Sequence, residues 1–174
     1  MQGLIHLYCG DGKGKTTAAM GLVVRALGRG LRAGIVQFLK NTPTGEILFL
    51  EKVPNVSILR GQDGKNFSFS MTLEQKTNTR HIHNAHLEQA RQWMLSGQYD
   101  LILLDEICAA YALDLIDREA VASFLQQKPP SMELILTGRD PAPLLVDAAD
   151  YITEMTLRRH PFEKGIPARR GIEF

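Results

Sequence analysis

A short segment rich in glycine and lysine near the start of the chain has the residue types of a phosphate-binding loop. Residues 9–17 read Cys-Gly-Asp-Gly-Lys-Gly-Lys-Thr-Thr and lie between an apolar run and a run of good helix formers. Glycines let successive backbone N–H groups turn inward, and the helix N-terminus adds partial positive charge. A lysine adds a full charge, and a threonine hydroxyl can bind Mg²⁺. The pattern predicts an ATP or GTP site built on Gly10, Gly12, Gly14, Lys15 and Thr16.

The spacing of this loop departs from the common pattern at its first position. The common pattern places a glycine where this chain has Cys9, whereas the first glycine here is Gly10. The alternative is a glycine-rich turn that binds nothing. Such a turn would have little reason to hold two lysines and two threonines against a helix start, so nucleotide binding is favoured.

Two carboxylates end a strongly apolar run of the chain. Asp105 and Glu106 follow the expected strand Leu101–Leu104 directly. In phosphate-loop proteins an acid at this place holds Mg²⁺, often through water. Asp105 could instead cap the short helix expected after it. Together with the glycine-rich loop, the metal interpretation is favoured for Asp105, whereas Glu106 could activate water or position the metal or the nucleotide.

Other candidate residues have simpler alternatives. His81, His83 and His86 could suggest a metal cluster, but only the last two could share a helix face, so a solvated helix face is predicted. Arg139 follows the expected strand Glu133–Leu136 and could reach either a phosphate or a carboxylate of a partner subunit. Both interpretations stay open.

Two segments are expected to be irregular. Residues 60–71 are predicted to form a surface loop that carries Phe67 and Phe69, which on sequence grounds alone are favoured as anchors of the loop over ligand contacts. Residues 157–174 are predicted to form a tail rich in proline, glycine and basic residues. This tail could be solvated, or it could fold over an anionic ligand.

The rest of the chain alternates between expected strands and helices. Because several of the strands are apolar on both faces, the pattern predicts an α/β fold, with a mostly parallel sheet covered by helices on both faces, in one domain over residues 1–174. The class is that of phosphate-loop NTPases, or RecA-like. Strands are expected at 4–9, 33–39, 56–59, 101–104, 133–136 and 151–155, and helices at 15–27, 44–51, 73–95, near 107, at 118–127 and at 142–148. Ligands of such sheets bind beyond the carboxyl ends of the strands.

Composition narrows the function. The 174 residues carry a net charge of +1, which gives no support for bulk binding to nucleic acid or to an anionic membrane. The two cysteines, Cys9 and Cys108, are expected to be small buried apolar residues because a disulfide framework needs more of them. Without a charged leader or an apolar run of about 20 residues, a cytoplasmic protein is expected.

The whole chain resembles the ATP:corrinoid (cob(I)alamin) adenosyltransferases of the phosphate-loop type. The unusual loop with no glycine at position 9 is also a feature of that family, and the order and spacing of many short motifs make the resemblance specific. The motifs are Gly10–Ala19, Val36–Lys40, Gly45-Glu46, Leu103–Glu106, Leu136–Arg139, Ala149-Asp150, Thr153–Met155, His160–Phe162, Gly165-Ile166 and Gly171–Glu173.

The resemblance implies a particular chemistry. ATP is expected to lie across the loop in the reverse of the usual direction, so that Co(I) of the corrinoid attacks its 5′ carbon and inorganic triphosphate leaves. The implied nucleotide-binding residues are Gly10, Asp11 near the ribose, Gly12, Lys13, Gly14, Lys15, Thr16, Thr17, Lys40 and Arg139. The implied residues for Mg²⁺, or Mn²⁺ as a substitute, are Thr16, Asp105 and Glu106. Catalysis would be positioning and charge neutralisation, with Lys15 and Glu106 as catalytic residues.

The resemblance also assigns roles outside the nucleotide site. Members of the family present a Phe-x-Trp pair that displaces the lower axial ligand of the corrinoid, so that Co(II) is easier to reduce. Phe67-Ser-Phe69 matches this pair, with Phe in place of Trp, and joins the implied catalytic set. A homodimer and a reducing protein such as a flavodoxin or flavin reductase are implied as partners. Some members carry an N-terminal helical extension that caps the site, whereas this sequence starts at the first strand.

Two other function classes remain open from the residues alone. A phosphate-loop ATPase or kinase would release phosphate or ADP instead of triphosphate. A non-catalytic binding module, such as a nucleotide-gated adaptor or a DNA-associated motor fragment, is the other class, and the near-neutral charge and lack of a basic stripe argue against binding of nucleic acid.

Overall fold

The computed structural model describes residues 2–64 and 70–174. Six strands form one sheet in the order β3-β2-β4-β5-β1-β6, and every neighbouring pair is parallel. The strands are β1 (Ile5–Cys9), β2 (Ala33–Phe38), β3 (Val56–Gly61), β4 (Leu101–Asp105), β5 (Glu133–Thr137) and β6 (Tyr151–Glu154).

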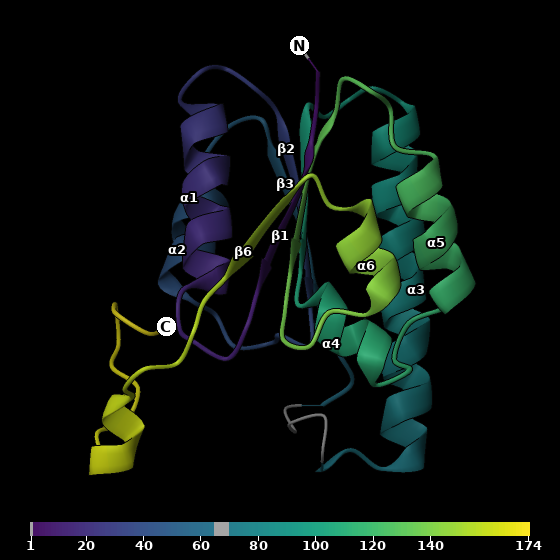
Figure 1. Ribbon diagram of the computed structural model, residues 1–174. Coiled ribbons are helices and arrows are strands. Elements are labelled where there is room, and N and C mark those ends of the chain that lie inside the picture. The colour runs from purple at the N-terminus through teal and green to yellow at the C-terminus, as the bar shows by residue number, and fades with distance from the viewer. Residues whose placement is uncertain (1, 65–69) are drawn as a thin grey trace.

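Helices cover both faces of this sheet (Figure 1). One face carries α1 (Lys15–Leu27) and α2 (Gly45–Leu50). The other carries α3 (Leu73–Leu95), α4 (Ile107–Ala112), α5 (Arg118–Gln126) and α6 (Pro143–Ala148). The predicted fold class is therefore confirmed, and the expected elements match the observed ones to within about two residues at each end. Among the described residues, no helix is long and apolar enough to cross a membrane.

Two apolar cores hold the sheet between its helix layers. The strands β2 and β4 are buried along their whole length because helices pack on both of their faces. Cys9 and Cys108 are both buried and free, as the sequence predicts. The edge strand β6 is exposed at every position.

Strand order brings several loops together at one end of the sheet. The strands β2, β4, β5 and β1 are consecutive neighbours, and all of them point the same way. The segments that follow them therefore meet at the carboxyl end of the sheet, where parallel α/β folds place their ligands. After β6 the chain continues into a tail with one 3-10 helix, Pro161–Lys164, and returns toward the first turn of α1 (Figure 1).

Candidate active site

The phosphate loop lies against the end of β6. The amide of Gly12 donates to the Met155 carbonyl at 2.6 Å, and the amide of Met155 donates to the Cys9 carbonyl at 2.8 Å. A Cβ at Gly10 or Gly12 would lie 2.6 or 2.7 Å from the Met155 oxygen, so neither position has room for a side chain. Gly14 has a φ of 121° and leads directly into α1. The glycines thus serve close backbone packing as well as the turn.

Lys15 is folded under the loop. Its Nζ donates to the carbonyls of Gly10 at 2.5 Å and Gly12 at 2.9 Å, and the side chain is buried. Burial lowers the pKa of Lys15, and the nearby Glu106 opposes that shift. The positive charge is therefore held at the centre of the loop, where a bound phosphate would lie.

Asp105 is the hub of a hydrogen-bond network at the end of β4. It is completely buried, and its Oδ1 accepts from the hydroxyls of Thr16 at 2.9 Å and Thr137 at 2.7 Å. Its Oδ2 accepts from Gln37 Nε2 at 3.0 Å and Lys40 Nζ at 2.7 Å. A carboxylate offers about four acceptor positions, so this arrangement uses all of them.

Glu106 follows with a backbone conformation that is rare for its residue type. Its φ is 63°, in the left-handed region, and its amide donates to Thr137 Oγ1 at 2.9 Å. Such conformations cluster at functional sites. Glu106, not Asp105, is the N-cap residue of α4, and its side chain makes no capping hydrogen bond. The alternative that Asp105 caps this helix is therefore wrong.

Lys40 joins the acids to the loop. Its Nζ lies 2.9 Å from Thr16 Oγ1, 2.7 Å from Asp105 Oδ2 and 3.8 Å from Glu106 Oε1. The residue before it, Leu39, has a left-handed φ of 57°. The turn after β2 thus directs the lysine toward the first turn of α1 and the end of β4.

A cavity of about 860 Å³ opens above these residues, within the size range of small-molecule sites. Loop residues, Lys40, Glu106 and Arg139 line one side of it. The tail forms another wall through Leu157, His160, Phe162, Glu163, Ala168, Gly171, Ile172, Glu173 and Phe174. The tail thus borders the site although all of its residues are exposed, and its folding over an anionic ligand stays a prediction.

One ion pair ties the tail to the phosphate loop. Glu173 Oε1 lies 2.9 Å from Lys13 Nζ and 3.1 Å from the Arg169 guanidinium. Hydrogen bonds from Arg169 first, and then from Lys13, lower the pKa of Glu173 to about 2. The tail therefore places an ionised carboxylate on the wall of the cavity.

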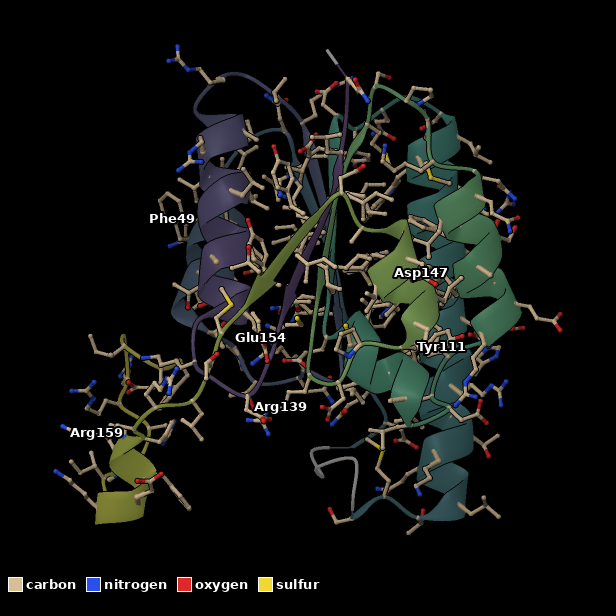
Figure 2. All side chains as sticks on the ribbon, in the orientation of Figure 1. Phe49, Tyr111, Arg139, Asp147, Glu154 and Arg159 are labelled. Atoms are coloured by element: carbon tan, nitrogen blue, oxygen red, sulfur yellow. The ribbon has the colours of Figure 1, made fainter. Side chains whose placement is uncertain are left out.

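The remaining loop residues are more exposed. Arg139 lies beyond the carboxyl ends of the strands (Figure 2), with its Nε 3.9 Å from Asp11 Oδ1. Both of these side chains are exposed, as is Thr17. Gly138 just before Arg139 is fixed by packing, because a Cβ there would lie 2.5 Å from the Cβ of Cys108.

Two members of the network were not predicted from the sequence. Gln37 and Thr137 are fully buried polar residues at the ends of the strands that flank β4. A polar residue at the carboxyl end of an otherwise apolar strand is the signal that could have identified them. Phe67 and Phe69, the predicted aromatic pair, lie outside the described residues.

The prediction of a solvated histidine face on α3 is wrong for His83. Its side chain is fully buried, its Nδ1 lies 2.9 Å from the Leu115 carbonyl, and its Nε2 accepts from the Leu39 amide at 3.3 Å. Burial lowers the pKa of His83 to about 4, so it is a neutral bridge between α3 and the turn before Lys40. His81 is exposed and His86 is half-buried.

The oxygen atoms of Thr16, Asp105 and Glu106 form a set suited to a small divalent cation. Mg²⁺ prefers hard oxygen donors and keeps several waters, so that one or two carboxylates and substrate phosphates suffice. Among the residues that the structure describes, no group of three or more His, Cys, Asp or Glu side chains could hold a metal ion by itself. The donors therefore fit Mg²⁺ delivered together with a nucleotide.

The family model and the similar curated proteins agree on one family. The family model described as "ATP:corrinoid adenosyltransferase BtuR/CobO/CobP" matches residues 1–174. The "Corrinoid adenosyltransferase" of Pseudomonas aeruginosa is 34% identical over 176 residues, covering 99% of this chain and 84% of that protein. The protein of the same name from Escherichia coli K12 is 32% identical over 178 residues, covering 99% of this chain and 86% of its own length.

A solved structure supports the fold. The KaiC-like protein PH0186 of Pyrococcus horikoshii OT3 superimposes with a TM-score of 0.56, at 16% sequence identity, over 91% of this chain and 75% of that one. At this identity the likeness concerns the fold alone.

Proposed function

The chain belongs to the ATP:corrinoid adenosyltransferase family, and on that premise we propose which of its residues carry out the transfer of the adenosyl group from ATP to a corrinoid. The observation that supports the assignment is the meeting of the phosphate loop with the ends of β2, β4 and β5 beneath one cavity. The conclusion is an enzyme whose substrates are ATP and a corrinoid.

The reaction needs little acid–base chemistry. The Co(I) electron pair forms a bond to the 5′ carbon of ATP, the bond from that carbon to the α-phosphate oxygen breaks, and triphosphate leaves with the bonding electrons. The nucleophile carries no proton to remove, and the leaving group is a stable polyanion. Catalysis therefore rests on positioning and on neutralising negative charge.

We propose that the phosphate loop binds the triphosphate. Its backbone N–H groups and Lys15 would contact the phosphates, and Lys13 would join them once it leaves Glu173. Asp11 would lie near the ribose, with Arg139 beside it at 3.9 Å. Binding in this direction leaves the 5′ carbon facing the corrinoid.

In the same proposal, the oxygen atoms of Thr16, Asp105 and Glu106 form the site for Mg²⁺, or for Mn²⁺ as a substitute. When bound, the metal supplies charge neutralisation on the leaving triphosphate. Thr16 and Glu106 would contact it, while Asp105 would orient the Thr16 hydroxyl and would accept from a metal-bound water once one of its four acceptor positions is vacated. No water attacks in this reaction, so Glu106 positions the metal and is not required as a base.

We propose that Phe67 and Phe69 displace the lower axial ligand of the corrinoid. This role predicts that a variant in which both residues are alanine behaves differently in two assays. Transfer to pre-reduced Co(I) corrinoid should remain nearly intact, whereas transfer that starts from Co(II) and a protein reductant should fail. Equal losses in both assays, with an unchanged thermal melt, would refute the role.

We propose two partners. One is a second copy of the chain, with which it forms a homodimer, and the other is a reducing protein such as a flavodoxin or flavin reductase. Within residues 2–64 and 70–174, β6 is an edge strand of the sheet with no strand on its outer side, and its Tyr151 and Ile152 are about half exposed. Exposed strand edges are sites of chain association. Sedimentation velocity tests the dimer, because a single species of monomer mass at micromolar concentration would contradict it.

The function is tested directly by the visible spectrum of the corrinoid. Chemically reduced Co(I) corrinoid, ATP and Mg²⁺ are incubated with purified protein in the absence of oxygen. The expected result is a light-sensitive alkylcorrinoid spectrum that requires ATP and enzyme. An unchanged Co(I) spectrum, with ATP converted to ADP, would move the chain to the ATPase alternative.

A further inference from the structure

Lys40 lies where a positive charge is needed to balance the two acids. Its ammonium contacts the oxygen atoms of Thr16 and Asp105 at 2.9 and 2.7 Å and lies 3.8 Å from Glu106. These are the three residues to which Mg²⁺ is assigned above, so the inference rests on that proposal. We infer that Lys40 is a built-in substitute for the divalent cation and keeps the metal site closed until ATP arrives.

The hydrogen-bond directions support this assignment. The Thr16 hydroxyl donates its proton to Asp105 Oδ1, so its lone pairs are the only means by which it can bind a cation, and Lys40 occupies one of them. The second oxygen of Asp105 is shared between Gln37 and Lys40. A cation that takes the position between Thr16 Oγ1 and Asp105 Oδ2 must first displace the Lys40 ammonium.

The surroundings explain why a lysine holds this position. Asp105 is completely buried, and a buried carboxylate without a partner is strongly unfavourable. Glu106 adds a second negative charge on the next residue. Lys40 therefore stabilises the acids in the nucleotide-free protein without an external ion.

The Lys40 side chain also has space to move when it is displaced. It is about a quarter exposed and lines the cavity together with Lys15 and the loop. When triphosphate enters with its metal, the displaced ammonium can move to the phosphate oxygens. Lys40 thus acts as a positioning residue that makes metal binding depend on the nucleotide.

The test measures Mn²⁺ binding to the protein without nucleotide, by the electron paramagnetic resonance signal of free Mn²⁺. Three proteins are compared: the parent, Lys40→Met and Lys13→Met. Lys13→Met is the control, because it removes the same charge from the same cavity but at a lysine that forms an ion pair with Glu173. Lys40→Met should bind Mn²⁺ about tenfold more tightly or better, because a unit charge a few ångströms from the site is removed. Lys13→Met should match the parent.

Two results would overturn the inference. One is equal Mn²⁺ affinity of the parent and Lys40→Met; the other is an equal gain in Lys13→Met, which would indicate only a general charge effect. If Lys40→Met does not fold, Lys40→Gln is measured instead, since its amide can still donate to Asp105 without a charge. Failure of Mg²⁺ to support adenosyl transfer in the parent would count against the metal proposal, and it is a separate assay.

Discussion

The Thr16 hydroxyl donates a hydrogen bond to Asp105 Oδ1 across 2.9 Å and so joins the first turn of α1 to the carboxyl end of β4. Thr137 Oγ1 donates to the same oxygen atom from β5. One buried carboxylate therefore ties the phosphate loop to the two central strands beside it. Its geometry sets both the stability of the site and the orientation of the hydroxyl that would contact the metal.

Replacing Thr16 with valine tests this contact, since valine keeps the shape and removes the hydroxyl. We expect a loss of about 1–2 kcal/mol in the free energy of unfolding, because a buried charged acceptor loses a donor. Thr16→Ser should restore most of the stability and the Mg²⁺ requirement of the parent. Urea unfolding measures the first effect, and a Thr16→Val variant as stable as the parent would show that the bond contributes nothing.

Lys15→Ala should abolish ATP binding and leave the fold intact. Lys128 offers a matched control at the other end of the sheet, because its Nζ also bonds backbone carbonyls, those of Gly3 at 3.0 Å and Pro129 at 3.2 Å. Burial lowers the pKa of both lysines. Calorimetry should find no ATP binding in Lys15→Ala and parental affinity in Lys128→Ala. Retained affinity in Lys15→Ala would refute the role of the phosphate loop.

Glu173 is predicted to weaken nucleotide binding, whereas the tail that carries it is predicted to strengthen that binding. Glu173→Gln removes a negative charge beside Lys13 and should tighten ATP binding about twofold to fivefold, with a smaller effect in high salt. Deleting the tail after Arg158 removes one wall of the cavity and should weaken binding instead. If Glu173→Gln weakens binding as much as the deletion does, Glu173 contacts the nucleotide directly.

His83 predicts a loss of stability in mild acid. Its pKa is about 4 in the folded protein, because the ring is buried, against 6.5 when exposed. The unfolded chain therefore takes up a proton first, and the fold loses up to about 3 kcal/mol as the pH falls from 6.5 to 4. His83→Gln, which keeps one donor and one acceptor, should lack this component. Parallel pH curves for the two proteins would contradict the assignment.

The fold could be predicted because its signals are local. Each buried strand is a short apolar run, and each long helix has clear limits, such as the glycine that starts α1 and the Thr72 capping box of α3. Alternation of strands and helices then indicates a parallel sheet. The order of the strands was not predicted, because it depends on packing between segments far apart in the chain.

The site was predicted only where a motif carries it. The loop and the acidic strand end follow known patterns, but Gln37 and Thr137 act through contacts that exist only after β2 and β5 flank β4. His83 was misjudged because its neighbours Leu39 and Leu115 come from distant segments. The tail likewise gave two alternatives, and its position at the cavity with all residues exposed leaves both of them open.

The central claim is that ATP is cut at its 5′ carbon, and ³¹P nuclear magnetic resonance of the products tests it most directly. Reduced corrinoid, ATP and Mg²⁺ are reacted to completion with the enzyme, and adenosylcorrinoid is quantified in the same sample. The account predicts inorganic triphosphate in equimolar amount with adenosylcorrinoid, and its loss in Lys15→Ala. Phosphate with ADP, or pyrophosphate with AMP, in place of triphosphate would contradict it.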